Sequence, residues 1–315
     1  MLQVSDHNQP SGTAPGRACL LAVSLILLFG SQASLAAPCP PAGYSREDLL
    51  ELKEGGFELP DASTRDELAL GLAACTGDPD PAIRDGVAYE ALAKWMRGGL
   101  LSTGTVDALG ADLLGQLAAP DDPRGFRKPF AALILSEVAR TDRIDPAFSA
   151  ARRESLVQTA SDYLSGMRDY RGFSETEGWR HGVAHGADLA LQLVLNPNID
   201  TGQVQRLLDA VASQVAPPGE HFYNYGEPGR LARPVFYAFR RGDISEEAWR
   251  SWFDRLADPA PMRHWSEAFS SQEGLARRHN ILAFLQALCV AADASDEPVD
   301  PALRALALDT LSAIP

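Results

Sequence analysis

Helix signals recur along this sequence with short polar interruptions, and almost no segment alternates apolar and polar residues as a half-buried strand would. We expect helices over residues 105–117, 129–140, 151–167, 176–195, 201–215, 234–241, 245–256, 275–292 and 301–314, preceded by helices that begin near Ser45, Ser63 and Pro81. Short helices joined by tight turns are typical of helix pairs stacked one on the next. The sequence therefore predicts an all-α single domain arranged as an irregular α-solenoid, although no strict sequence repeat is visible.

The first residues have the pattern of a secretory signal. Arg17 precedes an apolar run over residues 18–29, and Ser34 and Ala36 fit the small-x-small rule for cleavage. The apolar run has 12 residues, whereas a helix that spans a bilayer needs about 20, so a cleaved signal is favoured over a permanent anchor. We expect residues 1–36 to be removed during export to the periplasm or the cell exterior.

The expected mature chain has about 280 residues, which is enough for one domain with a sizeable core. We expect an N-terminal tail and first helix over residues 37–62 and an all-helical domain over residues 63–315, with its motifs concentrated in residues 165–240. The formal net charge of −14 repels phosphate backbones, so we expect no nucleic-acid partner. No later segment is apolar for long enough to suggest an integral membrane span.

Three cysteines remain in the expected mature chain, and an oxidising compartment would permit a disulfide between two of them. Cys39 lies in the Pro-rich N-terminal tail, and Cys75 lies at an expected helix end. A disulfide between these two would attach the N-terminal tail covalently to the helical domain. Cys289 lies in an apolar run, where a free thiol usually acts as a small buried hydrophobe.

The helix expected over residues 176–195 carries the polar residues most able to support chemistry. At about 100° per residue, Glu177, His181, His185 and Asp188 fall within roughly 80° of one another on a helical wheel. The other faces are nearly all small or apolar. We therefore expect this polar stripe to face a cleft or a buried polar partner.

Three interpretations of the stripe remain open. The side chains could satisfy one another or backbone groups as a structural network. Two histidines four residues apart with a nearby carboxylate also suit zinc or another divalent metal, with His181, His185 and Asp188 as ligands. In a metal-free pocket, His181 or His185 would bind a ligand or act as a general base, with a pKa tuned by Asp188 or Glu177.

The longest expected interruption between helices, over residues 217–233, has a polar and aromatic composition that is unusual for a linker. Long loops in compact domains are often functional. Tyr225 could line a pocket or simply pack at a helix entry. Glu227 and Arg230, three residues apart, could clamp a ligand or form a helix-start ion pair. No phosphate-binding, dinucleotide-binding or hydrolase motif accompanies them.

Three sequence blocks occur in a recognisable order: DYRGF at residues 169–173, GWRHGVAHGADL at 178–189 and YGEPGRLA at 225–232. Together they resemble the bacterial family catalogued as domain of unknown function 2785, most strongly over about residues 165–240. The resemblance implies an all-helical fold in the style of HEAT-like repeats and implies no particular activity. One departure is Pro228-Gly229, where acidic residues are expected. The positions that the resemblance marks for testing are Trp179, His181, His185, Asp188, Glu227 and Arg230.

These observations favour an exported helical-repeat protein that binds or scaffolds a small molecule or a protein through a polar pocket. The alternative is a metal-dependent hydrolase-type enzyme in which His181, His185 and Asp188 hold the ion or polarise water. The sequence does not decide whether the chain is an enzyme. The candidate ligand-binding residues are Glu177, Trp179, His181, His185, Asp188, Tyr225, Glu227 and Arg230.

Overall fold

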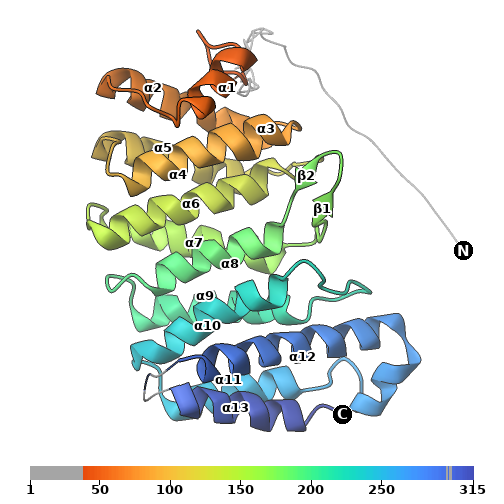
Figure 1. Ribbon diagram of the computed structural model, residues 1–315. Helices are drawn as coiled ribbons and strands as arrows, with labels where there is room; N and C mark the ends of the chain where they lie inside the picture. Colours follow the sequence, from red (N-terminus) through yellow and green to blue (C-terminus); the bar gives the residue numbers. More distant parts are fainter. Residues whose placement is uncertain (1–37, 296, 298–299) are drawn as a thin grey trace, which may run out of the picture. The chain divides into compact units, whose positions relative to one another are not determined.

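A computed structural model describes residues 38–295, 297 and 300–315, and almost all of the regular structure in these ranges is helical (Figure 1). The expected signal at residues 1–36 lies outside the described residues. The predicted all-α class is confirmed. In chain order the elements are α1 (Arg46–Glu54), α2 (Ala62–Leu72), η1 (Ala73–Gly77), α3 (Pro81–Ile83), η2 (Arg84–Tyr89), α4 (Glu90–Arg97), α5 (Thr103–Ala118), α6 (Arg127–Ile144), α7 (Ala150–Gly166), β1 (Phe173–Ser174), β2 (Gly178–Trp179), α8 (Gly182–Val194), α9 (Thr201–Val215), α10 (Glu227–Arg241), α11 (Glu246–Ala257), η3 (Trp265–Ser270), α12 (Gln272–Asp293) and α13 (Asp300–Ser312).

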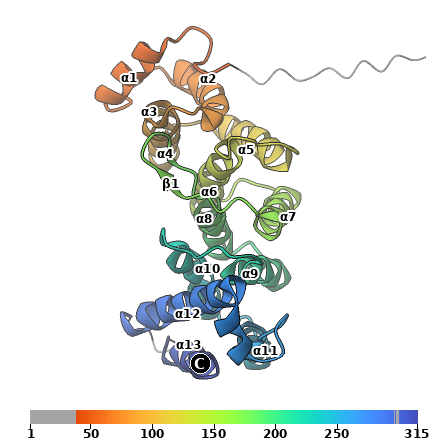
Figure 2. The ribbon, with the colours of Figure 1, turned by 90° about the vertical axis from the view of Figure 1, so that its right-hand side faces the viewer.

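Helices in the unit formed by residues 36–315 pack in two rows that follow the chain order (Figures 1 and 2). In one row α4, α6, α8, α10 and α12 each contact the next member, and in the other α5, α7 and α9 do the same. Cross-contacts join α5 to α6, α7 to α8 and α9 to α10. No helix in the described ranges is long and apolar enough to cross a membrane.

The central helix of this packing is α8, which contacts α6, α7, α9 and α10. All of its residues except Gln192 are buried, and Ala187, Leu189 and Ala190 are completely inaccessible. Complete burial of a Leu or Val side chain contributes about 1.5–3 kcal/mol. The fold therefore fixes α8 from several directions, and the polar side chains of α8 are held just as firmly.

Helix starts follow the chemistry that the sequence indicates. Ser45 caps α1 in a capping box with Asp48, and Asp80 caps the turn that Pro81 begins. The expected start at Ser63 lies two residues too late, because Asp61 accepts the capping hydrogen bond from the backbone N–H of Thr64. Such differences arise because several neighbouring polar residues compete for the same cap.

The Cys39–Cys75 disulfide is present, which confirms the predicted pairing. It ties the N-terminal tail to η1. Cys289 is free and half-buried, so it is more accessible than the buried hydrophobe that its apolar surroundings suggested. Burial raises the pKa of its thiol, so this cysteine lacks the low pKa of a reactive nucleophile.

Candidate functional site

The expected helix over residues 176–195 was wrong in its first part. Residues 173–179 form a small antiparallel hairpin in which Phe173 pairs with Trp179, and α8 begins only at Gly182. His181 precedes that helix in the left-handed region, at φ 58°. A non-glycine residue pays about 1–3 kcal/mol for this conformation, and such strain is commonly found at functional sites. Glu177 therefore does not share a helical stripe with the two histidines.

A stack of two arginines on one phenylalanine attaches this hairpin to the body of the protein. The guanidinium carbons of Arg84 and Arg180 each lie 4.1 Å from the ring centre of Phe126. The fully buried Arg84 donates to the backbone carbonyls of Asp78 and of Glu177, at 2.9 and 2.8 Å. Because Glu177 lies in the turn of the hairpin, this last bond holds the hairpin directly against η2.

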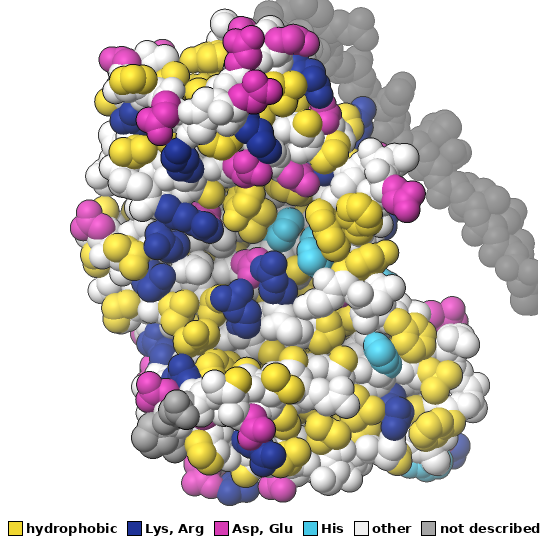
Figure 3. Space-filling model, viewed as in Figure 1, with side chains coloured by type: hydrophobic (Ala, Val, Ile, Leu, Met, Phe, Trp, Pro, Cys, Tyr) yellow, Lys and Arg dark blue, Asp and Glu magenta, His cyan; other side chains and the backbone are white. Residues whose placement is uncertain are grey.

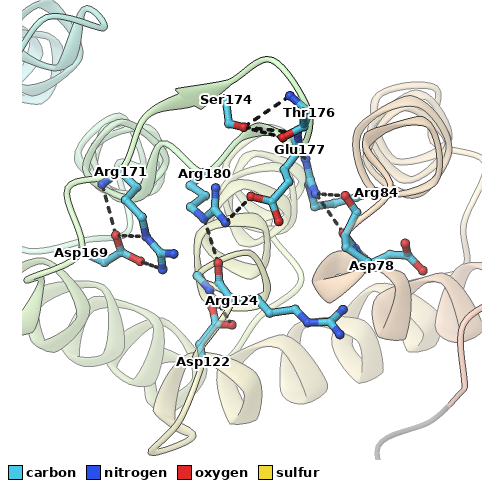
Figure 4. Close-up of polar contacts among 12 residues, drawn as sticks. Asp78, Arg84, Asp122, Arg124, Asp169, Arg171, Ser174, Thr176, Glu177 and Arg180 are labelled. Atoms are coloured by element: carbon cyan, nitrogen blue, oxygen red, sulfur yellow. Dashed lines mark hydrogen bonds and ion pairs between the residues drawn. The ribbon is translucent and has the colours of Figure 1, made fainter.

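Arg180 makes the second attachment, which Figure 4 shows from the hairpin side. Its Nε donates to the carbonyl of Arg124 at 2.8 Å, and its Nη2 donates to the Glu177 carboxylate at 3.0 Å. Arg180 is only 7% exposed, although it is the strongest polar residue in an apolar stretch. An aromatic ring and a backbone carbonyl from a distant segment of the chain cover it.

Tyr225 reaches the hairpin from the loop before α10, and Gly172 makes that approach possible. A Cβ at Gly172 would lie 2.0 Å from Cδ2 of the Tyr225 ring, so no larger residue fits there without displacement of the tyrosine. The Tyr225 ring packs against Trp179 edge to face at 5.7 Å between centroids. The first and third sequence blocks thus meet in space at a glycine and a tyrosine.

His181 and His185 have their ring orientations fixed by backbone carbonyls. His181 Nε2 lies 3.1 Å from the carbonyl oxygen of Tyr225, and His185 Nδ1 lies 3.2 Å from that of Pro129. A carbonyl only accepts, so each of these nitrogens carries the proton. The other ring nitrogen of each histidine is then an acceptor, and no hydrogen bond occupies it within the described part of the chain.

Both imidazoles are neutral at pH 7. Burial lowers the pKa of His185 to about 3, and the nearby His181 and Arg230 act in the same direction. Burial also lowers the pKa of His181, against an opposing hydrogen bond to Tyr225. The ring centroids of the two histidines lie 5.7 Å apart, and Trp179 stacks on His181 at 4.6 Å. The site therefore presents two uncharged acceptor nitrogens beside an indole.

Asp188, one turn further along α8, is shared by two arginines of α10. It accepts a hydrogen bond from Arg230, and its Oδ1 lies 3.8 Å from Nη1 of Arg233. Burial raises the pKa of this carboxyl, and the two guanidinium groups oppose that rise. Arg230 pairs with Asp188 and not with Glu227, so of the two interpretations left open for these residues the helix-start ion pair is wrong.

These side chains line a pocket of about 560 Å³ between the hairpin, η2 and the row formed by α4, α6, α8 and α10. Trp179, His181, His185, Asp188 and Arg230, all of them predicted from the sequence, are among its lining residues. Figure 3 shows histidine side chains at the middle of this face, with acidic, basic and apolar side chains around them. The volume lies within the range of about 300–1,000 Å³ that is typical of small-molecule sites.

The remaining predicted residues lie beside the pocket and shape it. Glu177 belongs to the arginine stack. Glu227 is 3% exposed and accepts from the backbone N–H of Tyr225 at 2.9 Å, which fixes the entry to α10. Burial raises its pKa. Tyr225 is 36% exposed at the rim and supplies the carbonyl that orients His181.

Four titratable lining residues were missed because they lie in earlier helices outside the sequence blocks. Asp85 and Tyr89 lie on η2, which is a π-helix, and Arg97 and Glu137 form an ion pair between α4 and α6. Short π-helical segments occur frequently at functional sites. Pro81 precedes Arg84 and Gly86 lies within η2, but neither residue distinguishes a π-helix from an ordinary helix start. Arg233, one turn beyond Arg230, was missed although the helical spacing could have suggested it.

The family comparison covers the three sequence blocks at residues 169–173, 178–189 and 225–232. A family model described as protein of unknown function (DUF2785) matches residues 113–290, and the chain belongs to this family. That range includes all of the predicted pocket residues but excludes η2 and Arg97. Neither the curated proteins nor the solved structures gave a match.

The geometry does not favour the predicted metal ligands. No group of three or more His, Cys, Asp or Glu side chains within residues 38–295, 297 and 300–315 is arranged to hold a metal ion. Asp188 is already engaged by two guanidinium groups, and a cation beside Arg230 and Arg233 would be repelled. Zinc held by His181, His185 and Asp188 therefore stays a prediction without geometric support.

We predict that the protein, purified without an affinity tag or a chelator, contains substoichiometric zinc and no other stoichiometric divalent metal. Elemental analysis by mass spectrometry measures this directly. The matched control for His185→Ala is His264→Ala, because His264 is an exposed histidine outside the pocket. One zinc per chain that disappears in His185→Ala alone, with thermal unfolding preserved, would restore the metal-dependent interpretation.

Proposed function

We propose that this chain is an exported, HEAT-like helical-repeat protein that binds a small molecule in the pocket beneath the β1–β2 hairpin. The observation that carries the proposal is that His185 presents in the pocket an acceptor nitrogen that is unpaired among residues 38–295, 297 and 300–315. Its side chain is 7% exposed, lines the pocket, and has an acceptor nitrogen with no hydrogen-bond partner within the described residues. An acceptor nitrogen that faces a pocket without a protein partner is available to water or to a ligand that donates a hydrogen bond.

The repeat architecture is supported by the two rows of helices in which each member contacts the next. In an α-solenoid, one row lines an inner face and presents side chains from successive repeats to a single ligand. The pocket draws on η2, α4, α6, α8 and α10 in this way. A ligand that touches several of these helices would stabilise the packing between them.

Export is supported by the secretory pattern of the first residues and by the Cys39–Cys75 disulfide. Disulfides persist in the periplasm and outside the cell and are rare in a reducing cytosol. A binding role is favoured over an enzymatic role because neither histidine has, among the residues that the structure describes, a carboxylate partner that would raise its basicity. Each imidazole is oriented by a carbonyl and has a lowered pKa, which makes it a weak general base.

We predict that a thermal-shift panel of sugars, sugar acids, amino acids, nucleotides and dicarboxylates contains at least one class that raises the melting temperature. A ligand at about 100 times its Kd stabilises the folded state by about 2.7 kcal/mol. Gln192→Trp fills the pocket from a partly exposed position on α8 and abolishes the shift. The matched control is Gln158→Trp on the exposed surface of α7, which retains it. No stabilising class, or an equal shift in both variants, contradicts the proposal.

We also predict that the chain, expressed in a Gram-negative host, is recovered from the periplasm with Ala37 as its first residue. N-terminal sequencing or intact mass measures the cleavage site. Ala36→Phe blocks cleavage because the peptidase requires a small residue there. Ala42→Phe, placed beyond the expected cleavage site, is the control and leaves cleavage unchanged. Recovery of the uncleaved chain from the cytosol is the result that contradicts export.

A further inference from the structure

The two histidines that line the pocket require a ligand that donates hydrogen bonds. His185 Nδ1 donates to the carbonyl of Pro129, so Nε2 of His185 is an acceptor. His181 Nε2 donates to the carbonyl of Tyr225, so Nδ1 of His181 is an acceptor as well. A ligand that satisfies these nitrogens must carry O–H or N–H groups.

The wall formed by α10 offers donors and positive charge. Arg233 makes no hydrogen bond within the described residues, and Arg230 uses only Nη1, toward Asp188. Both side chains are about half exposed, at 53% and 41%, while Asp188 beneath them is 11% exposed. One carboxylate therefore faces two guanidinium groups, and one positive charge is left in excess. A planar carboxylate is the anion that a guanidinium fork binds with two parallel hydrogen bonds.

Trp179, which lines the pocket, belongs to a group of three exposed aromatic rings. Phe173, Trp179 and Tyr225 are 46%, 37% and 36% exposed, and Trp179 contacts each of the other two at 5.0 and 5.7 Å between ring centroids. Three exposed aromatic rings in contact with one another are unusual on a surface, because each could lower the free energy by burial. Such a group suits the apolar face of a ring that also carries polar substituents.

We infer that the pocket binds a ring-shaped hydroxy acid of the sugar-acid class, and this inference rests on the proposed function. The carboxylate of the ligand binds Arg233 and Arg230, a ring hydroxyl donates to Nε2 of His185, and the C–H face of the ring packs on Trp179. A phosphorylated sugar fits less well, because a phosphate monoester carries a charge of about −1.5 to −2 at pH 7, whereas the arginine pair has one charge in excess of Asp188.

The test uses four probes: D-glucuronate, D-glucose, cyclohexanecarboxylate and D-glucose 6-phosphate. Isothermal titration calorimetry with the mature chain measures the affinity of each. We expect D-glucuronate to bind at least about tenfold more tightly than D-glucose, which lacks the carboxylate, because one charge-assisted hydrogen bond is worth about a factor of ten or more. We expect it also to bind at least about tenfold more tightly than cyclohexanecarboxylate, because that probe lacks the hydroxyls that donate to the histidines. The phosphate ester binds more weakly than D-glucuronate.

Matched variants separate the arginine contact from a general loss of charge. Arg233→Gln weakens D-glucuronate binding by about tenfold or more and leaves the weak binding of D-glucose unchanged. Arg255→Gln is the control, because Arg255 has a similar exposure of 56%, pairs with an exposed aspartate and lies outside this pocket. Trp179→Ala weakens the binding of every ring-shaped probe. Because Trp179 is exposed, this substitution leaves the folding of the core intact.

Equal affinity for D-glucose and D-glucuronate, tighter binding of the phosphate ester, or an unchanged affinity in Arg233→Gln would overturn the inference. If none of the four probes binds while another class in the thermal-shift panel is displaced by Gln192→Trp, the ligand class is wrong and the proposed function stands. If neither the probes nor the panel binds, both fail.

Discussion

The stack of Arg84 and Arg180 on Phe126 is the interaction on which the site depends. A guanidinium group that is 0% exposed is expensive to bury unless its donors are satisfied, and Arg84 meets this condition with Asp85 and with backbone carbonyls on both sides. Burial lowers the pKa of Arg84, and Asp85 opposes that effect. One of those carbonyls belongs to Glu177. The Arg84 side chain therefore connects η2 to the hairpin.

The position of the hairpin determines the geometry of the pocket. The chain leaves β2 at Trp179, passes through the buried Arg180 and turns at His181 in the left-handed region before α8 begins. This turn places the ring of His181 between Trp179 and the carbonyl of Tyr225. His185 and Asp188 follow on a helix that four neighbouring helices enclose. The strained turn is thus tolerated because tight packing on either side fixes both of its ends.

Much of the helical architecture could be predicted because helix periodicity and capping are local properties. His185 and Asp188 also stand out in the sequence of an otherwise apolar helix, and both line the pocket. The hairpin could not be predicted in the same way. Two-residue strands are too short to show alternation, and the two glycines of the GWRHG segment, although each disfavours a helix by about 1 kcal/mol, do not by themselves specify a hairpin.

What the sequence could not supply are the long-range partners. Arg180 is covered by Phe126 and by the carbonyl of Arg124, both of which lie far from it in the chain. Arg97 and Glu137 join the pocket from helices outside the blocks that drew attention to residues 165–240. Such contacts depend on how successive helices stack, which a single sequence does not encode in any short pattern.

The most direct measurement of the central claim is backbone ¹⁵N relaxation of an Arg84→Met variant. The exposed Arg46, which pairs with Asp80, provides the matched control Arg46→Met. If Arg84 holds the hairpin, order parameters over residues 173–179 fall below about 0.6 in Arg84→Met, while α8 stays near 0.85 and Arg46→Met matches the wild type. A hairpin that remains as rigid in Arg84→Met as in the control contradicts the account, because the pocket wall would then have another anchor.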